Sequence, residues 1–264
     1  MGRRLILMLT LFVVLGGLLG SLAMAQWTVL RGGNLILKID GAATPNVLPR
    51  DRLAPISFRG RGEIGTADDT HPPAIREFVL DIERGGAIDP VGLPVCAASQ
   101  LEARDTKGAK RACGRAIVGT GVGSGVVSFP EQRPIPVTTP LTLFNGGRRG
   151  GATTVLLHAF ITVPVPAAIV TRIELQTIPR GHYGIRVVGE VPVIAGGSGS
   201  ATAFDFKFGR RFAHGGRPKS YVLGSCPDGA VDFKVVRAVF KDEIGHVGDV
   251  DLSGSWILPC VTRE

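Results

Sequence analysis

Apolar and polar residues alternate along much of the chain, in short runs separated by Gly and Pro. The alternation is strict at residues 204–208 (FDFKF), and at 76–83 it places Phe78, Leu80 and Ile82 on one face with acidic residues opposite. Because successive side chains of a β-strand point to opposite faces, both segments are predicted to form half-buried strands.

Similar runs recur along the chain, bounded by turn residues. The further strands predicted from them lie at 27–30, 34–39, 56–60, 141–144, 154–163, 171–178, 184–193, 201–208, 220–223, 231–240 and 252–258. Many short strands at regular spacing predict an all-β fold, and a β-sandwich of the jelly-roll-like or Ig-like kind is favoured. A barrel with a similar number of strands is the alternative.

One segment departs from the β pattern. Residues 97–116 are rich in charged and helix-forming residues, with Ser99 as a candidate N-cap and Gly114 as a candidate stop. They predict one short helical excursion near residues 99–113.

The first 25 residues have the organisation of a secretory signal. Arg3 and Arg4 precede an apolar run that begins at Leu5, and the run closes on Ala23-Met24-Ala25. A positive start, an apolar centre and a small-x-small end predict a cleavable signal peptide at 1–25. An uncleaved membrane anchor is the alternative, since the run is about long enough to span a bilayer.

Residues 26–264 are predicted to form a single β-rich exported domain. Gly (37) and Pro (18) are abundant and aromatic residues make up 6% of the chain, a composition that suits many strands joined by turns. The segment 194–200 (IAGGSGS) is either a hairpin loop or a boundary between two sub-domains, and one continuous domain is favoured.

Four cysteines are present, at 96, 113, 226 and 260. An even number in a chain exported to an oxidising compartment predicts two disulfides. Three connectivities are possible, and Cys96–Cys113 with Cys226–Cys260 is favoured because each pair lies within one local segment. The chain has no C-x-x-C motif and no His at ligand spacing from a Cys, so structural bridges are favoured over a metal or redox site.

The formal net charge is +8, with basic clusters at Arg59/Arg61, at Arg148/Arg149 and within 210–219. On an exported protein, this charge suits contact with an anionic envelope polymer or another surface protein. Ordinary solvated arginines are the simpler explanation. Nucleic-acid binding is disfavoured because the clusters lack interleaved aromatic residues. After signal cleavage, no membrane span is expected.

No constellation of residues indicates a catalytic site, a cofactor or a metal. The segment most suited to ligand contact is the polar, Pro-stiffened loop that contains Asp68, Asp69 and His71. The alternative role for this loop is a rigid connector into the strand at Phe78.

The glycines at 119, 121, 123 and 125 suggest a phosphate-binding loop. That interpretation needs a following Lys and a helix, and the chain instead continues as VVSF. A strand with close backbone approach or a bulge is therefore predicted.

Several motifs together resemble a group of uncharacterised exported bacterial β-rich proteins. They are Gly92-Leu93-Pro94-x-Cys96, then Ala112-Cys113-Gly114-x-Ala116-x-Val118-Gly119-Thr120-Gly121, then Ser220-Tyr221-x-Leu223-x-Ser225-Cys226, with Thr70-His71-Pro72-Pro73-Ala74 and Phe144-Asn145-Gly146-Gly147. The similarity covers roughly residues 50–260 and departs at the turn 242–251. It implies an exported fold with both cysteine pairs, and it implies no activity.

The favoured function is a non-enzymatic binding or structural protein of the cell envelope or extracellular space. The alternative is an exported carbohydrate-active or other hydrolase on a jelly-roll-like scaffold, with Asp68, Asp69 or Glu243 as the working carboxylates. Two carboxyl groups that face each other across a deep cleft would favour the hydrolase. A module held to an anionic polymer by its arginines is a third hypothesis.

Overall fold

The computed structural model describes residues 27–129, 131–242 and 248–263. The predicted signal at 1–25 and the candidate carboxylate Glu243 lie outside the described residues.

Twelve long strands form the body of the molecule. They are β1 (Thr28–Gly32), β2 (Leu35–Thr44), β4 (Ala54–Thr66), β5 (Ala74–Glu83), β7 (Ile117–Val127), β8 (Ile135–Arg149), β9 (Ala152–Ile161), β10 (Ala167–Thr177), β11 (Tyr183–Glu190), β12 (Gly199–Phe208), β16 (Ala230–Lys241) and β17 (Val250–Pro259). The shorter strands are β3 (Val47–Pro49), β6 (Gly86–Ile88), β13 (Arg211–His214), β14 (Arg217–Ser220), β15 (Val222–Gly224) and β18 (Val261–Arg263).

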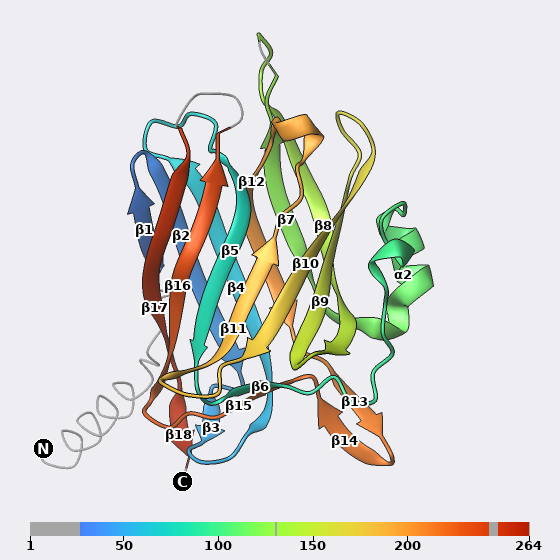
Figure 1. The fold of residues 1–264 in the computed structure, drawn as a ribbon, viewed down its shortest axis with the longest axis vertical. Helices are drawn as coiled ribbons and strands as arrows, with labels where there is room; N and C mark the ends of the chain where they lie inside the picture. The colour runs from blue at the N-terminus through green and yellow to red at the C-terminus, as the bar shows by residue number, and fades with distance from the viewer. Residues whose placement is uncertain (1–26, 130, 243–247, 264) are drawn as a thin grey trace, which may run out of the picture.

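The twelve long strands belong to one antiparallel sheet. Their order is β1-β2-β4-β12-β7-β8-β9-β10-β11-β5-β16-β17, and the sheet curls so that its two edge strands meet (Figure 1). The all-β prediction is confirmed. The expected sandwich gives way to a nearly closed, barrel-like wall, because the strands hydrogen-bond in one continuous path instead of dividing between two sheets.

The two edge strands, β1 and β17, interlock through side chains. An added Cβ on Gly32 would overlap the side chain of Leu252, and one on Gly254 would overlap that of Leu30. Each leucine therefore lies directly over a glycine of the other edge, and the absence of a side chain there lets the two backbones approach. This side-chain contact brings the two edges of the nearly closed wall together.

The apolar core lies on the inner face of the wall beside this seam. Its buried residues come mainly from β2, β16 and β17, and they include Leu37, Val235 and Trp256. The rings of Phe233 and Trp256 stack with their centroids 4.7 Å apart. The alternation predicted from sequence thus places apolar side chains inside the wall.

Short strands cover one end of the wall. There β15 pairs with both β4 and β6, and β3 pairs with β18 (Figure 1). Tyr221, Leu93 and Val222 form a buried cluster in this region, and the Cys226–Cys260 disulfide packs on Leu48 nearby. This end is therefore filled by packed side chains.

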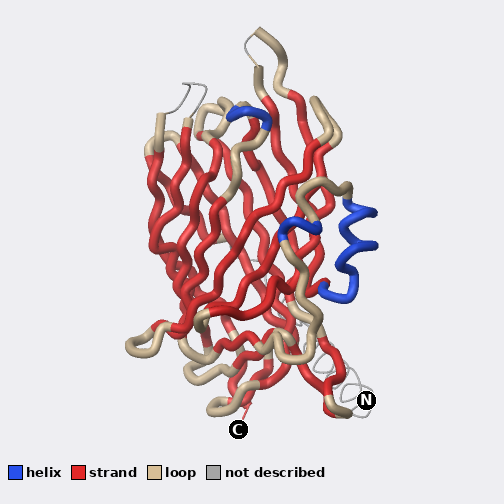
Figure 2. Tube along the Cα trace, turned by 45° about the vertical axis from the view of Figure 1, so that its right-hand side comes forward, coloured by secondary structure: helices blue, strands red, loops and turns tan. Residues whose placement is uncertain are grey.

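The predicted helical excursion forms outside the wall, against β8 and β9 (Figure 2). It comprises the 3₁₀ helices η2 (Ala98–Gln100) and η3 (Gly114–Ala116) and the α-helix α2 (Thr106–Cys113). The α-helix begins later than expected because Asp105, not Ser99, is its N-cap, with the Asp105 carboxylate accepting from Gly108 N at 2.6 Å.

Both disulfides have the predicted pairing, Cys96–Cys113 and Cys226–Cys260. The first fastens the start of the excursion to the end of α2. The second joins the segment after β15 to the end of β17.

Candidate functional site

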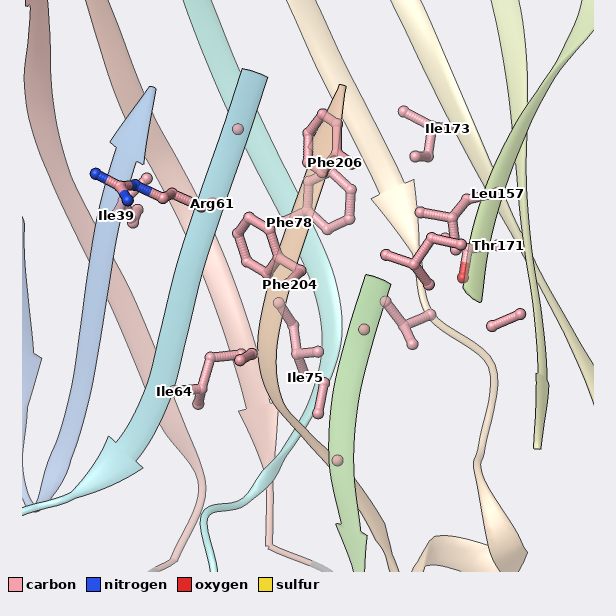
Figure 3. A pocket seen from close by; sticks show the side chains of 18 of the residues that line it. Ile39, Arg61, Ile64, Ile75, Phe78, Leu157, Thr171, Ile173, Phe204 and Phe206 are labelled. Atoms are coloured by element: carbon pink, nitrogen blue, oxygen red, sulfur yellow. The ribbon is translucent and has the colours of Figure 1, made fainter. Parts of the chain in front are cut away.

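The wall encloses a cavity of about 400 Å³. Residues from all around the wall, from β2 to β17, line it, and Phe78, Phe204 and Phe206 project into it (Figure 3). This volume lies within the range of small-molecule pockets, roughly 300–1,000 Å³. The interior of the barrel is thus the candidate functional site.

Large apolar side chains on the inner face remain only half-buried. They include Phe78, Leu80, Leu157, Ile173 and Phe204, and each of them lines the cavity. Protein interiors are normally packed to the density of organic crystals. These residues therefore border space that the protein does not fill with its own atoms.

Phenylalanine rings cover glycines across neighbouring strands of the inner face. Phe204 pairs with Gly62 and Phe206 with Gly60, and an added Cβ would lie 2.5 and 2.8 Å from the respective ring Cζ atoms. Because the opposite positions carry no side chain, these rings lie along the wall and leave the centre of the barrel open.

The glycine-rich segment at 119–125 is part of strand β7. An added Cβ on Gly119 would lie 2.6 Å from the carbonyl oxygen of Lys207, and one on Gly125 2.6 Å from that of Ser200. The register of β7 is also irregular at its pairings with β8 and β12. The prediction of a strand with close backbone approach or a bulge is confirmed, and both features are present.

Few polar side chains line the cavity. Among the described lining residues, the charged ones are Asp40 and Arg61. Arg61 alternates with the inner-face residues Gly60 and Gly62, so its side chain lies on the outer face of β4, where Nε lies 2.7 Å from Oδ2 of Asp40. The hydroxyl of Thr139 donates to the carbonyl of Phe160 at 2.8 Å. These groups are therefore engaged within the protein.

Ser200 is a further polar lining residue, and it contacts the predicted ligand loop. Ser200 is 4% exposed, and its Oγ lies 2.9 Å from Nε2 of His71. The loop that follows β4 thus meets the start of β12, at the end of the barrel opposite the short strands β3, β6, β15 and β18 (Figure 1).

The two aspartates of the predicted loop have other environments. The Asp68 carboxylate accepts from the hydroxyl of Thr70 and from Nδ2 of Asn34, each at 2.7 Å, and these bonds hold the pKa of Asp68 well below its usual range. Asp69 is exposed, with a φ of 58°. Of the three predicted residues, His71 is the one that contacts a residue of the cavity wall.

A second polar cluster lies outside the wall on β5, β11 and β16. The Tyr183 hydroxyl donates to Oδ2 of Asp232 at 2.8 Å, and this bond raises the pKa of Tyr183 to about 12. Arg186 forms two hydrogen bonds to the buried carboxylate of Asp81, at 2.7 and 2.8 Å. Within the described ranges, no group of His, Cys, Asp or Glu is arranged to hold a metal ion.

Several members of the basic clusters bond to other groups of the protein. Arg59 pairs with Asp205, and Lys219 with Asp89 at 2.7 Å. The Arg210 guanidinium donates to the carbonyl of Ile117 at 3.0 Å. The two ion pairs reduce the positive charge that the Arg59/Arg61 cluster and the 210–219 cluster present to an anionic partner.

Within the part of the chain that the structure describes, no helix has both the length and the apolar character needed to cross a bilayer.

No protein-family model, curated protein or solved structure matches this chain. The site is therefore interpreted from its own geometry.

Sequence reasoning found His71 but missed both the cavity and Ser200. The signal for the cavity was present in the strands, because glycines occupy successive inner-face positions of β4 and β7 and alternate along each strand with outer-face residues. To interpret this signal, the register is needed, because it sets most of these glycines opposite the phenylalanines of β12. Ser200 sits in an ordinary Gly/Ser run, and only the fold brings it to His71.

Proposed function

We propose that this protein binds an apolar small molecule inside its barrel-like wall, as a non-enzymatic exported binding protein. The observation that carries the proposal is the cavity of about 400 Å³ bordered by half-buried Phe, Leu and Ile side chains. Transfer of an apolar molecule from water into such a space is favourable by roughly 25 cal/mol for each Å² of apolar surface removed from water.

Export to the cell surface or extracellular space belongs to the same proposal. Two disulfides are features of proteins that live in oxidising compartments, and residues 1–25 have the pattern of a secretory signal. A protein in that location that holds an apolar molecule in its interior would shield it from water during transfer or storage.

The test is binding of N-phenyl-1-naphthylamine, an uncharged dye whose fluorescence rises in apolar surroundings. Ala201 lines the cavity, so Ala201→Phe is expected to fill part of the space and weaken dye binding by about tenfold or more. The matched control is Val122→Phe, at a side chain 49% exposed on the same sheet. Equal binding by both variants and the wild type, or no binding by the wild type, would overturn the proposal.

A further inference from the structure

The Ser200–His71 contact gives the cavity a polar end. Ser200 lines the space and is 4% exposed, and the neighbouring cavity residues Val127, Val137 and Ile161 form an apolar cluster. A buried hydroxyl in such surroundings orients a ligand, because small-molecule sites combine mainly apolar walls with a few placed polar groups.

The Ser200 hydroxyl retains hydrogen-bonding capacity after it has bonded His71. A hydroxyl offers one donor and two acceptor positions, and the contact of 2.9 Å to Nε2 uses one of them. Whichever ring nitrogen carries the proton, at least one position remains for a ligand.

The charges of the residues around the cavity restrict which polar head group a ligand can carry. Among the described lining residues, Arg61 is the cation, and strand alternation directs its side chain to the outer face of β4, where it pairs with Asp40 at 2.7 Å. Burial of a carboxylate or phosphate without a partner cation is strongly unfavourable. An uncharged head with a hydroxyl or carbonyl group needs only a hydrogen bond.

From these observations, and resting on the proposed apolar-ligand function, we infer that the ligand is an amphipath with a single uncharged polar head. Its head hydrogen-bonds Ser200, and its hydrocarbon part lies along the cavity toward Phe206 and Leu157. His71 is a positioning residue that fixes the serine rotamer. Long-chain alcohols and acyl esters are the chemical class that fits.

The experiment compares three molecules with the same chain, decane, 1-decanol and decanoate, as competitors of N-phenyl-1-naphthylamine at pH 8. Decanol is expected to bind about three- to tenfold more tightly than decane, the usual effect of one neutral hydrogen bond, and more tightly than decanoate. In Ser200→Ala, decanol should lose its advantage and bind no more tightly than decane, because its buried hydroxyl has no partner. Ser200→Thr keeps a hydroxyl and should keep the preference.

The control is Thr171→Val, which removes another hydroxyl from the cavity lining at nearly constant volume and should leave the decanol preference intact. Decane affinity reports whether the cavity survives each substitution. If decane binds but decanol has no advantage in the wild type, or keeps its advantage in Ser200→Ala, the head-group inference is wrong while the proposed function stands. If neither binds the wild type, both are wrong.

Discussion

At the scale of single residues, the two tyrosines of the chain show how different surroundings produce the same direction of pKa shift. Burial raises the pKa of Tyr221, whose side chain is fully buried beside Asn145. The hydrogen bond to Asp232 raises the pKa of Tyr183 to about 12. In both cases the phenol is held in its neutral form.

This yields a titration prediction. Tyrosinate absorbance of the native protein should be nearly absent at pH 10.5, although an unfolded chain would be more than half ionised there, since the free phenol has a pKa of about 10. Because both pKa values are raised, their contribution to stability is complete below pH 10 and is lost as pH rises toward 12.

Asp232→Asn should lower the pKa of Tyr183 and leave that of Tyr221 in place. Native protein with about a quarter of its tyrosine ionised near pH 10, the amount expected if Tyr183 titrated as a free phenol, would contradict the assigned hydrogen bond.

Glycines of the inner face give a second prediction at this scale. An added Cβ at Gly189 would overlap the ring of Phe78, so Gly189→Ala should lower the free energy of unfolding by about 1–3 kcal/mol. The control is Gly65→Ala, where nothing lies within 4 Å of the added atom. Urea denaturation of both variants would measure this, and equal stabilities would show that the ring does not occupy that position.

At the scale of elements, strands were predictable and their ends were less so. Period-two alternation located the inner-face residues Phe78, Leu80 and Ile82, because one side of each strand must avoid water. The sequence predicted a helix within the excursion and a helix forms there, but its N-cap is Asp105 instead of Ser99. Ser99 and Asp105 are both good capping residues, and only packing against β8 and β9 decides between them.

The excursion provides a prediction about its disulfide. Replacing Cys96 and Cys113 together by Ala opens a loop of 17 residues and should cost about 3 kcal/mol in the chain-entropy model. Denaturant unfolding should still be cooperative, because the strands of the wall do not depend on this bridge. A loss of all β-sheet circular dichroism in this variant would show that the excursion is integral to the wall.

At the scale of the whole molecule, sequence could not separate a sandwich from a barrel. Both folds need the same alternation of apolar and polar residues along each strand. They differ in whether the edge strands β1 and β17 come into contact. The Leu30–Gly254 and Leu252–Gly32 contacts that join them link residues more than 200 positions apart. The cavity could not be predicted for the same reason. Its volume depends on how the strands from β2 to β17 are arranged around it, and no single motif encodes that arrangement.

The central claim is that the interior holds apolar space unfilled by the protein. Xenon enters dry apolar cavities of proteins, so a crystal structure determined under xenon pressure tests the claim directly. The account predicts xenon inside the wall, in contact with Phe78, Leu157 or Phe206. An interior without xenon, filled instead by inner-face side chains packed against one another, would contradict it.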